Sequence, residues 1–156
     1  MKPRIEVIEE KTLIGMSLPM SVADNQTFKL FSTFMPRRKE IRNAVNADIF
    51  DLRVYPADYF QAFDPTKVFT KWALSEVSQN EEVPSQMEKF KLPGGKYAVF
   101  THKGPSADMG IFQYIFTQWL PKSGYSLDSR PHFEILGEKY SRQDPNSEEE
   151  IWIPVV

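Results

Sequence analysis

The stretches "LFSTFMPR" (30–37) and "IFTQWLPK" (115–122) decide the fold, because each is an apolar helical stripe that ends at a proline. The two are separated by 85 residues, and seven of their eight positions match in character. Core helices often share an apolar stripe, but a shared proline directly after a shared apolar pair is less common. The match therefore predicts an internal duplication.

Strand-like segments surround the two helices in the same way. Each helix is preceded by one segment rich in β-branched and aromatic residues and is followed by two more. These segments are 4–20, 48–56 and 66–79 around the first helix, and 87–104, 130–140 and 149–156 around the second. Within 87–104, the run Pro93-Gly94-Gly95 predicts a hairpin turn.

This order predicts an α+β fold with two β-α-β-β repeats, at about 3–79 and 85–156, related by a pseudo-twofold axis in one domain that covers 1–156. We expect an antiparallel sheet with the two main helices on one face. The opposite face is then open, and a ligand groove is expected there at the seam between the repeats.

The composition limits the function classes. The 156 residues carry a net charge of −2, which does not favour direct binding to nucleic acid. There are no cysteines, and the two histidines lie in separate strand-like segments, so neither a metal site nor a cofactor is predicted. No apolar run is long enough to cross a membrane and no signal peptide is evident, which predicts a cytoplasmic protein. The high aromatic content, 13%, suits a core or a ligand cavity.

Two glutamates interrupt the last apolar strands. Side chains alternate between the two faces of a strand, so Ile151 and Ile153 are expected to face the helices and Glu150 and Trp152 to face away. In "HFEIL" (132–136), Phe133 and Ile135 are the natural core pair. This assignment places Glu134 beside Glu150 on the open face.

A glutamate on an exposed strand needs no function, and a plain solvent-exposed face is the simplest interpretation. Trp152 favours a site instead, because a large ring on the same face would otherwise be exposed. From the predicted hairpin (87–104), either Tyr97 or Phe100 must share that face. Aromatic rings around a carboxylate are suited to an organic cation.

The stretches "FMPRRKEI", "LPGGKYAVFTHKGP", "YIFTQWLPKSGYSLDSRPHFEIL" and "EEEIWIPV", in this order, resemble the GyrI-like small-molecule-binding family, also called the bacterial transcription-activator effector-binding domain. The resemblance covers nearly the whole chain and implies the same duplicated fold. It also implies that Glu134 and Glu150 are the acidic ligand contacts and that Trp152 lies beside them. Aromatic residues of the second helix, with Tyr114 and Trp119 as candidates, are implied to line the pocket.

Family members that are fused to AraC- or MerR-type DNA-binding domains capture effectors, often lipophilic cations. Because this chain begins directly with a strand-like segment, it resembles the stand-alone branch of the family. That branch includes a protein that protects DNA gyrase and hydrolases that open cyclopropane-bearing toxins with paired glutamates. The resemblance is therefore compatible with a protein partner, either gyrase or a separate DNA-binding regulator.

Two functions follow. The first is a sensor or sequestering protein that binds a small hydrophobic or cationic molecule through Glu134, Glu150, Trp152, Trp119, Tyr114 and Tyr97. The second is a hydrolase that detoxifies cyclopropane-bearing or similar electrophiles, with Glu134 and Glu150 as its catalytic pair.

Overall fold

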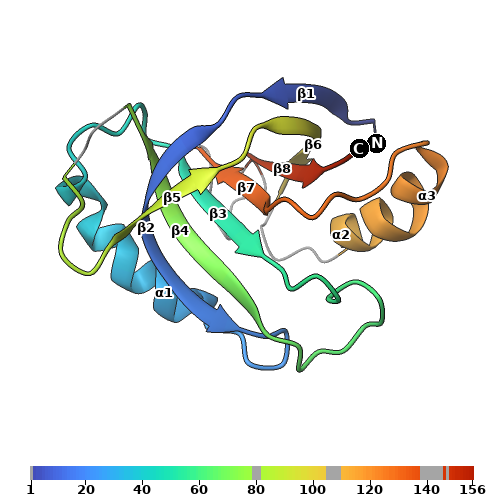
Figure 1. The fold of residues 1–156 in the computed structure, drawn as a ribbon, viewed down its shortest axis with the longest axis horizontal. Helices are drawn as coiled ribbons and strands as arrows, with labels where there is room; N and C mark the ends of the chain where they lie inside the picture. Colours follow the sequence, from blue (N-terminus) through green and yellow to red (C-terminus); the bar gives the residue numbers. More distant parts are fainter. Residues whose placement is uncertain (1, 79–81, 105–109, 138–145, 147) are drawn as a thin grey trace.

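One antiparallel sheet of eight strands, in the order β1-β6-β8-β7-β3-β4-β2-β5, forms the centre of the molecule (Figure 1). The structure is a computed structural model that describes residues 2–78, 82–104, 110–137, 146 and 148–156. The strands are β1 (Arg4–Ile8), β2 (Lys11–Met20), β3 (Ile49–Val54), β4 (Phe69–Val77), β5 (Glu88–Leu92), β6 (Gly95–Lys103), β7 (His132–Leu136) and β8 (Glu148–Pro154). The predicted α+β fold is confirmed.

Two helical segments connect the strands. The first is α1 (Thr27–Phe34), which continues as the 3-10 helix η1 (Met35–Glu40). The second runs through α2 (Gly110–Tyr114), the π-helical turn η2 (Ile115–Trp119) and α3 (Leu120–Lys122). Pro36 is the second residue of η1, and Pro121 is the second residue of α3. The helix type changes at these points because proline lacks the N–H that would continue the hydrogen bonding of the preceding helix. Within the described ranges, no helix is long and apolar enough to span a membrane.

The six inner strands have a twofold order. One unit is β2-α1-β3-β4, and the other is β6, the second helical segment, β7 and β8. From its outer side to the centre of the sheet, one unit has the order β6-β8-β7 and the other has the order β2-β4-β3. In both units the strand that comes last in the chain lies in the middle, and β7 and β3 meet at the centre of the sheet. The predicted duplication is therefore confirmed in the fold, whereas its boundaries, 3–79 and 85–156, stay a prediction.

The two outer strands are exchanged between the units. β1 continues into β2 in the chain but pairs with β6, and β5 continues into β6 but pairs with β2. The hairpin predicted around Pro93-Gly94-Gly95 is therefore wrong: β5 and β6 form one bent ribbon, and β1 and β2 form another. At its bend, a Cβ on Gly94 would lie 2.6 Å from the backbone oxygen of Ile8, so glycine allows the two bent ribbons to cross.

A row of six side chains crosses the sheet and shows which face carries the helices. Paired positions in adjacent strands connect Met16, Ala73, Asp51, Glu134, Ile151 and Phe100 in this order. α1 packs over the first end of this row through Leu30 and Phe34, and α2 and η2 pack over the other end through Ile111 and Ile115. Both helical segments therefore cover the same face, as predicted, and they lie apart with β3 and β7 between them (Figure 1).

The opposite face of the sheet is a second core. Leu52, Tyr97, Phe133 and Trp152 are buried there, under the crossing of the bent ribbons. The predicted open face with a ligand groove is therefore wrong, because the exchanged strands fold over that face and side chains fill it. A cavity of about 870 Å³ lies instead on the helix-bearing face.

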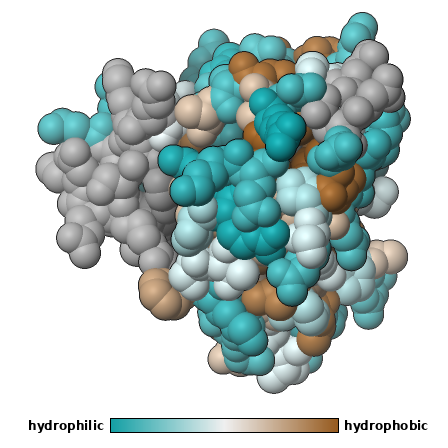
Figure 2. Space-filling view, turned by 90° about the vertical axis from the view of Figure 1, so that its left-hand side faces the viewer, coloured by the Kyte–Doolittle hydropathy of each residue, from teal (hydrophilic) through white to brown (hydrophobic). Residues whose placement is uncertain are grey.

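The side of the molecule that carries η1 is largely hydrophilic, with hydrophobic residues in small separate patches (Figure 2). Arg38 and Lys39 of η1, and Arg42 shortly after its end, are exposed to solvent.

Candidate functional site

Glu134 lies on the helix-bearing face, in the middle of the sheet. In the register of β7 and β8, Glu134 is opposite Ile151, and Phe133 is opposite Trp152 in the second core. The prediction that Phe133 and Ile135 face the helices, and that Glu134 faces away, is therefore wrong. Both faces of this sheet are apolar, so the alternation in β7 separates its two faces without showing which one the helices cover.

Glu150 lies on the other face and does not meet Glu134. Its carboxylate is 2.7 Å from the Arg4 guanidinium and accepts a 3.2 Å hydrogen bond from the indole Nε1 of Trp152. The expected convergence of Glu134 and Glu150 is therefore wrong, because their positions in the ladder have opposite orientations. Glu149 is the glutamate that shares the face of Glu134, and the two side chains are hydrogen-bonded.

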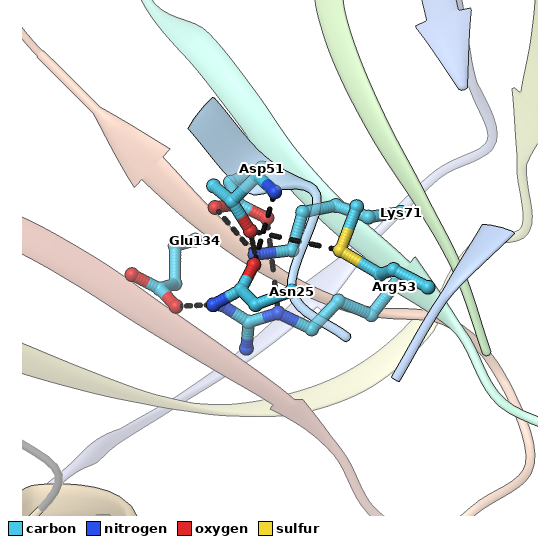
Figure 3. Close-up of polar contacts among 7 residues, drawn as sticks. Asn25, Asp51, Arg53, Lys71 and Glu134 are labelled. Carbon is cyan, nitrogen blue, oxygen red and sulfur yellow. Dashed lines mark hydrogen bonds and ion pairs between the residues drawn. The ribbon is translucent and has the colours of Figure 1, made fainter. Parts of the chain in front are cut away.

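Five charged residues meet at the centre of the helix-bearing face, which we call the central charged cluster: Asp51, Arg53, Lys71, Glu134 and Glu149. Figure 3 shows the first four of them. Arg53 donates a hydrogen bond to Glu134 and places its Nε 3.7 Å from Asp51 Oδ1. Lys71 Nζ lies 3.5 Å from Asp51 Oδ2 and donates a 2.9 Å hydrogen bond to Thr27 Oγ1 of α1. Alternation in β3 and β7 positions Asp51, Arg53 and Glu134 on one face.

Burial and pairing push the two glutamate pKa values apart. Burial raises the pKa of Glu149 to about 9, and its hydrogen bond with the neighbouring Glu134 adds to the rise. Burial also acts against the charge of Glu134, but the Arg53 guanidinium and the hydrogen bonds outweigh this, so the pKa of Glu134 is lowered. At neutral pH Glu149 is therefore protonated, while Glu134 is a carboxylate that is paired with Arg53.

An aromatic cluster lies beside the central charged cluster. It consists of Tyr55, Tyr59, Phe60, Phe116 and His132. The ring of Phe60, from the β3–β4 connection, stacks on His132 at 5.3 Å and on Phe116 of η2 at 5.6 Å between centroids. Burial, with a further contribution from Arg53, lowers the pKa of His132 to about 3, so this imidazole is neutral at pH 7.

The cavity of about 870 Å³ occupies the α1 side of the same face. Its apolar lining comes from α1, η1, β3 and the end of β7, and Asp51 is its buried carboxylate. The lining residues are Thr27, Phe28, Phe31, Ser32, Met35, Pro36, Arg38, Ala47, Ile49, Asp51, Leu136 and Gly137. This space can hold an aromatic molecule, with one acidic group to orient it.

The aromatic residues predicted for the site lie elsewhere. Tyr97 and Trp152 are buried in the second core, with ring centroids 5.8 Å apart. Tyr114 and Trp119 line a separate cavity of about 210 Å³ on the second helical segment. None of these four is among the residues described as lining the larger cavity. Their contact with a ligand therefore stays a prediction, for a place other than this cavity.

Sequence reasoning missed Asp51, Arg53, Lys71 and Glu149. The signal that identifies Glu134, a charge between large apolar residues of a strand, also marks Asp51 between Phe50 and Leu52. In the described part of the chain, no group of three or more His, Cys, Asp or Glu side chains could hold a metal ion.

Comparison with known sequences places these features in a family context. The sequence model of a family described as Cass2, integron-associated effector binding protein, matches residues 4–155. The transcriptional regulator BrlR of Pseudomonas aeruginosa is 29% identical over 146 residues, which are 92% of this chain and 52% of BrlR. The chain thus spans about half the length of this relative. The predicted resemblance to GyrI-like effector-binding domains is confirmed.

Solved structures share the fold. SAV2435 bound to tetraphenylphosphonium has a TM-score of 0.75 at 15% identity, over 100% of this chain and 94% of SAV2435. The integron cassette protein VCH_CASS2 of Vibrio cholerae has a TM-score of 0.65 at 17% identity, over 99% of this chain and 96% of VCH_CASS2.

Proposed function

We propose that this chain, which belongs to the Cass2 family of integron-associated effector-binding proteins, binds a small hydrophobic organic molecule in the cavity between α1 and the centre of the sheet. The observation that carries the proposal is the cavity itself. Its volume, about 870 Å³, is within the range of about 300–1,000 Å³ that is typical of small-molecule sites. Phe31, Ile49 and Leu136 supply apolar contact, and Asp51 supplies an acidic group.

A cationic ligand is supported by the chemistry of the lining. Aromatic ring faces attract positive charge, and Asp51 is a buried carboxylate at the cavity. The relative SAV2435, which has the same fold, was solved with the cation tetraphenylphosphonium. Glu149 holds a proton at neutral pH, and release of this proton would add a negative charge close to a bound cation.

In this proposal the protein acts as a sensor or a sequestering protein. The similarity to part of the regulator BrlR supports a sensor that works together with a DNA-binding partner, and gyrase is the other partner that we consider. A sequestering protein needs no partner, because high affinity for the ligand is enough.

Thermal-shift measurements with neutral and cationic aromatic compounds test the proposal. Ser32, on α1, lines the cavity, whereas its neighbour Thr33 does not, although both are exposed. Ser32→Trp is expected to abolish the shift by filling the cavity, and the matched control Thr33→Trp is expected to retain it. Shifts that are equally large in both variants, or absent in the wild type for every compound, would contradict the proposal.

A second candidate function is a glutamate-dependent hydrolase for cyclopropane-bearing or similar electrophiles. The hydrogen-bonded pair of Glu134 and Glu149 favours it, because a low and a raised pKa suit a general base and a general acid. Neither glutamate is among the described lining residues of the cavity, which favours binding over hydrolysis. Product formation from a spirocyclopropyl electrophile above the buffer rate, lost in Glu134→Gln and Glu149→Gln but kept in Glu150→Gln, would support the hydrolase.

A further inference from the structure

Asp51 has a carboxylate oxygen without a hydrogen-bond partner at the cavity. The residue is 7% exposed, and its Oδ1 is buried and accepts no hydrogen bond. Buried carboxylate oxygens are normally hydrogen-bonded, because water that is lost on burial must be replaced by another donor. Because Asp51 also lines the cavity, a ligand bound there can supply the missing donor.

The two neighbouring cations form ion pairs with Asp51 but leave its Oδ1 without a hydrogen bond. The Arg53 guanidinium donates to Glu134, and its Nε stays 3.7 Å from Asp51 Oδ1, too far for a hydrogen bond. Lys71 lies near the other oxygen, Oδ2, and donates to Thr27 Oγ1. Glu134 is thus a positioning residue, because its bond to Arg53 keeps that guanidinium from satisfying Asp51.

We propose that Asp51 anchors the ligand and that the ligand is a flat apolar molecule with a cationic N–H group, such as a protonated amine or amidine, whose N–H donates to Asp51 Oδ1. This assignment rests on the proposed function and names its ligand class. The rings of Phe28 and Phe31 and the side chain of Leu136 contact the apolar body. A quaternary ammonium or phosphonium ion neutralises the carboxylate but donates no hydrogen bond, so Oδ1 stays unsatisfied.

A matched pair of probes separates charge from hydrogen bonding. Dimethyl(naphthylmethyl)amine, protonated at about pH 7, and trimethyl(naphthylmethyl)ammonium share the aromatic body and the charge, and methylnaphthalene is the neutral reference. Calorimetric titration of the full chain is expected to show the amine binding about tenfold or more tightly than the quaternary ion. In Asp51→Leu this ratio is expected to fall to about one, with methylnaphthalene bound as tightly as before.

Two further variants keep the test decisive. Asp51→Asn retains volume and one oxygen acceptor, and it is expected to weaken both cations about tenfold or more while binding of methylnaphthalene stays unchanged. Glu150→Gln, on the opposite face, is expected to leave all three affinities unchanged. Equal affinity for both cations in the wild type, or unchanged cation binding in Asp51→Asn, would overturn the assignment of Asp51. No binding of any probe would overturn the proposed function together with it.

Discussion

The guanidinium of Arg53 is ion-paired with the carboxylate of Glu134 between the two central strands of the sheet. The family resemblance implied that Glu134 meets the ligand, but in this chain an internal cation already holds that carboxylate. Arg53 has a pKa well above its ordinary range, because the attraction of Glu134 and Asp51 outweighs the effect of burial. The guanidinium therefore stays charged, and a ligand has to use a different acidic group or displace Arg53.

Removing Arg53 is expected to destabilise the fold strongly. Arg53→Met leaves Glu134 and Asp51 buried with Lys71 as the remaining cation beside them, and breaking a buried pair costs about 3–5 kcal/mol. Chemical denaturation measures this cost. Arg4→Met is the control, because Arg4 is also ion-paired, with Glu150, but is about half exposed and is expected to cost less than about 1 kcal/mol. Equal losses in the two variants would show that the central pair contributes no more than a surface pair.

Glu149 is expected to make the protein less stable as the pH rises. Its pKa is about 9 in the folded state, against an ordinary value of 4.5, so between these values the folded state holds a proton that the unfolded state has released. The stabilisation is complete below pH 4.5 and is lost as the pH rises through about 9, at up to about 1.4 kcal/mol per pH unit. The free energy of unfolding of Glu149→Gln, measured from pH 6 to pH 9, is expected not to show this decrease.

The difference between wild type and Glu149→Gln isolates this effect. The variant is expected to gain stability relative to the wild type at each step up in pH. Glu150→Gln serves as the control, because it leaves the hydrogen bond between Glu134 and Glu149 in place. Parallel stability curves for the wild type and Glu149→Gln would contradict a proton shared by the glutamate pair.

His132 is expected to act in the opposite direction, on the acid side. Its pKa is about 3 in the folded state, against an ordinary value of 6.5, so the unfolded state binds the additional proton between these values. Stability is lost as the pH falls from 6.5 towards 3, by about 2 kcal/mol at pH 5. His132→Phe keeps a ring beside Phe60 and is expected to lack this loss in acid unfolding. If the variant loses as much stability as the wild type between pH 7 and pH 5, this account of His132 is wrong.

The crossing of the bent ribbons is expected to require glycine at position 94. Gly94→Ala places a Cβ 2.6 Å from the backbone oxygen of Ile8, and backbone yields less readily than a flexible side chain. We expect a loss of about 1–3 kcal/mol in the free energy of unfolding. Gly137→Ala is the control, because its Cβ would meet only a side-chain oxygen of Asp48, at 3.4 Å. A smaller loss at Gly94 than at Gly137 would contradict a close crossing.

Much of the fold could be predicted from two features of the sequence. The matched helices and the strand-like segments around them predict the duplication and the single helix-bearing face. The partners of the outer strands could not be predicted, because a Pro-Gly-Gly run is compatible with both a tight turn and a bend between two ladders. Only the tertiary contact of Gly94 with Ile8 distinguishes these two outcomes.

The site shows the same limit. Ile151 and Ile153 were correctly placed on the helix-bearing face, and the same alternation assigns Glu149 to that face. The wrong assignment of faces concerned β7, where large apolar residues flank Glu134. These residues pack in the second core, which is as apolar as the core under the helices. The pairing register between β7 and β8 decides the face, and this register depends on contacts between distant parts of the chain.

A crystal structure of the protein with a brominated naphthylmethylamine tests the central claim, that the binding site lies on the helix-bearing face at Asp51, most directly. Anomalous scattering from bromine locates the ring independently of any assumption about the site. We predict the ring between Phe31 and Leu136, with the amine nitrogen within hydrogen-bonding distance of Asp51 Oδ1. Bromine density beside Trp152 and Tyr97, or in the separate cavity at Tyr114 and Trp119 on the second helical segment, would contradict this claim.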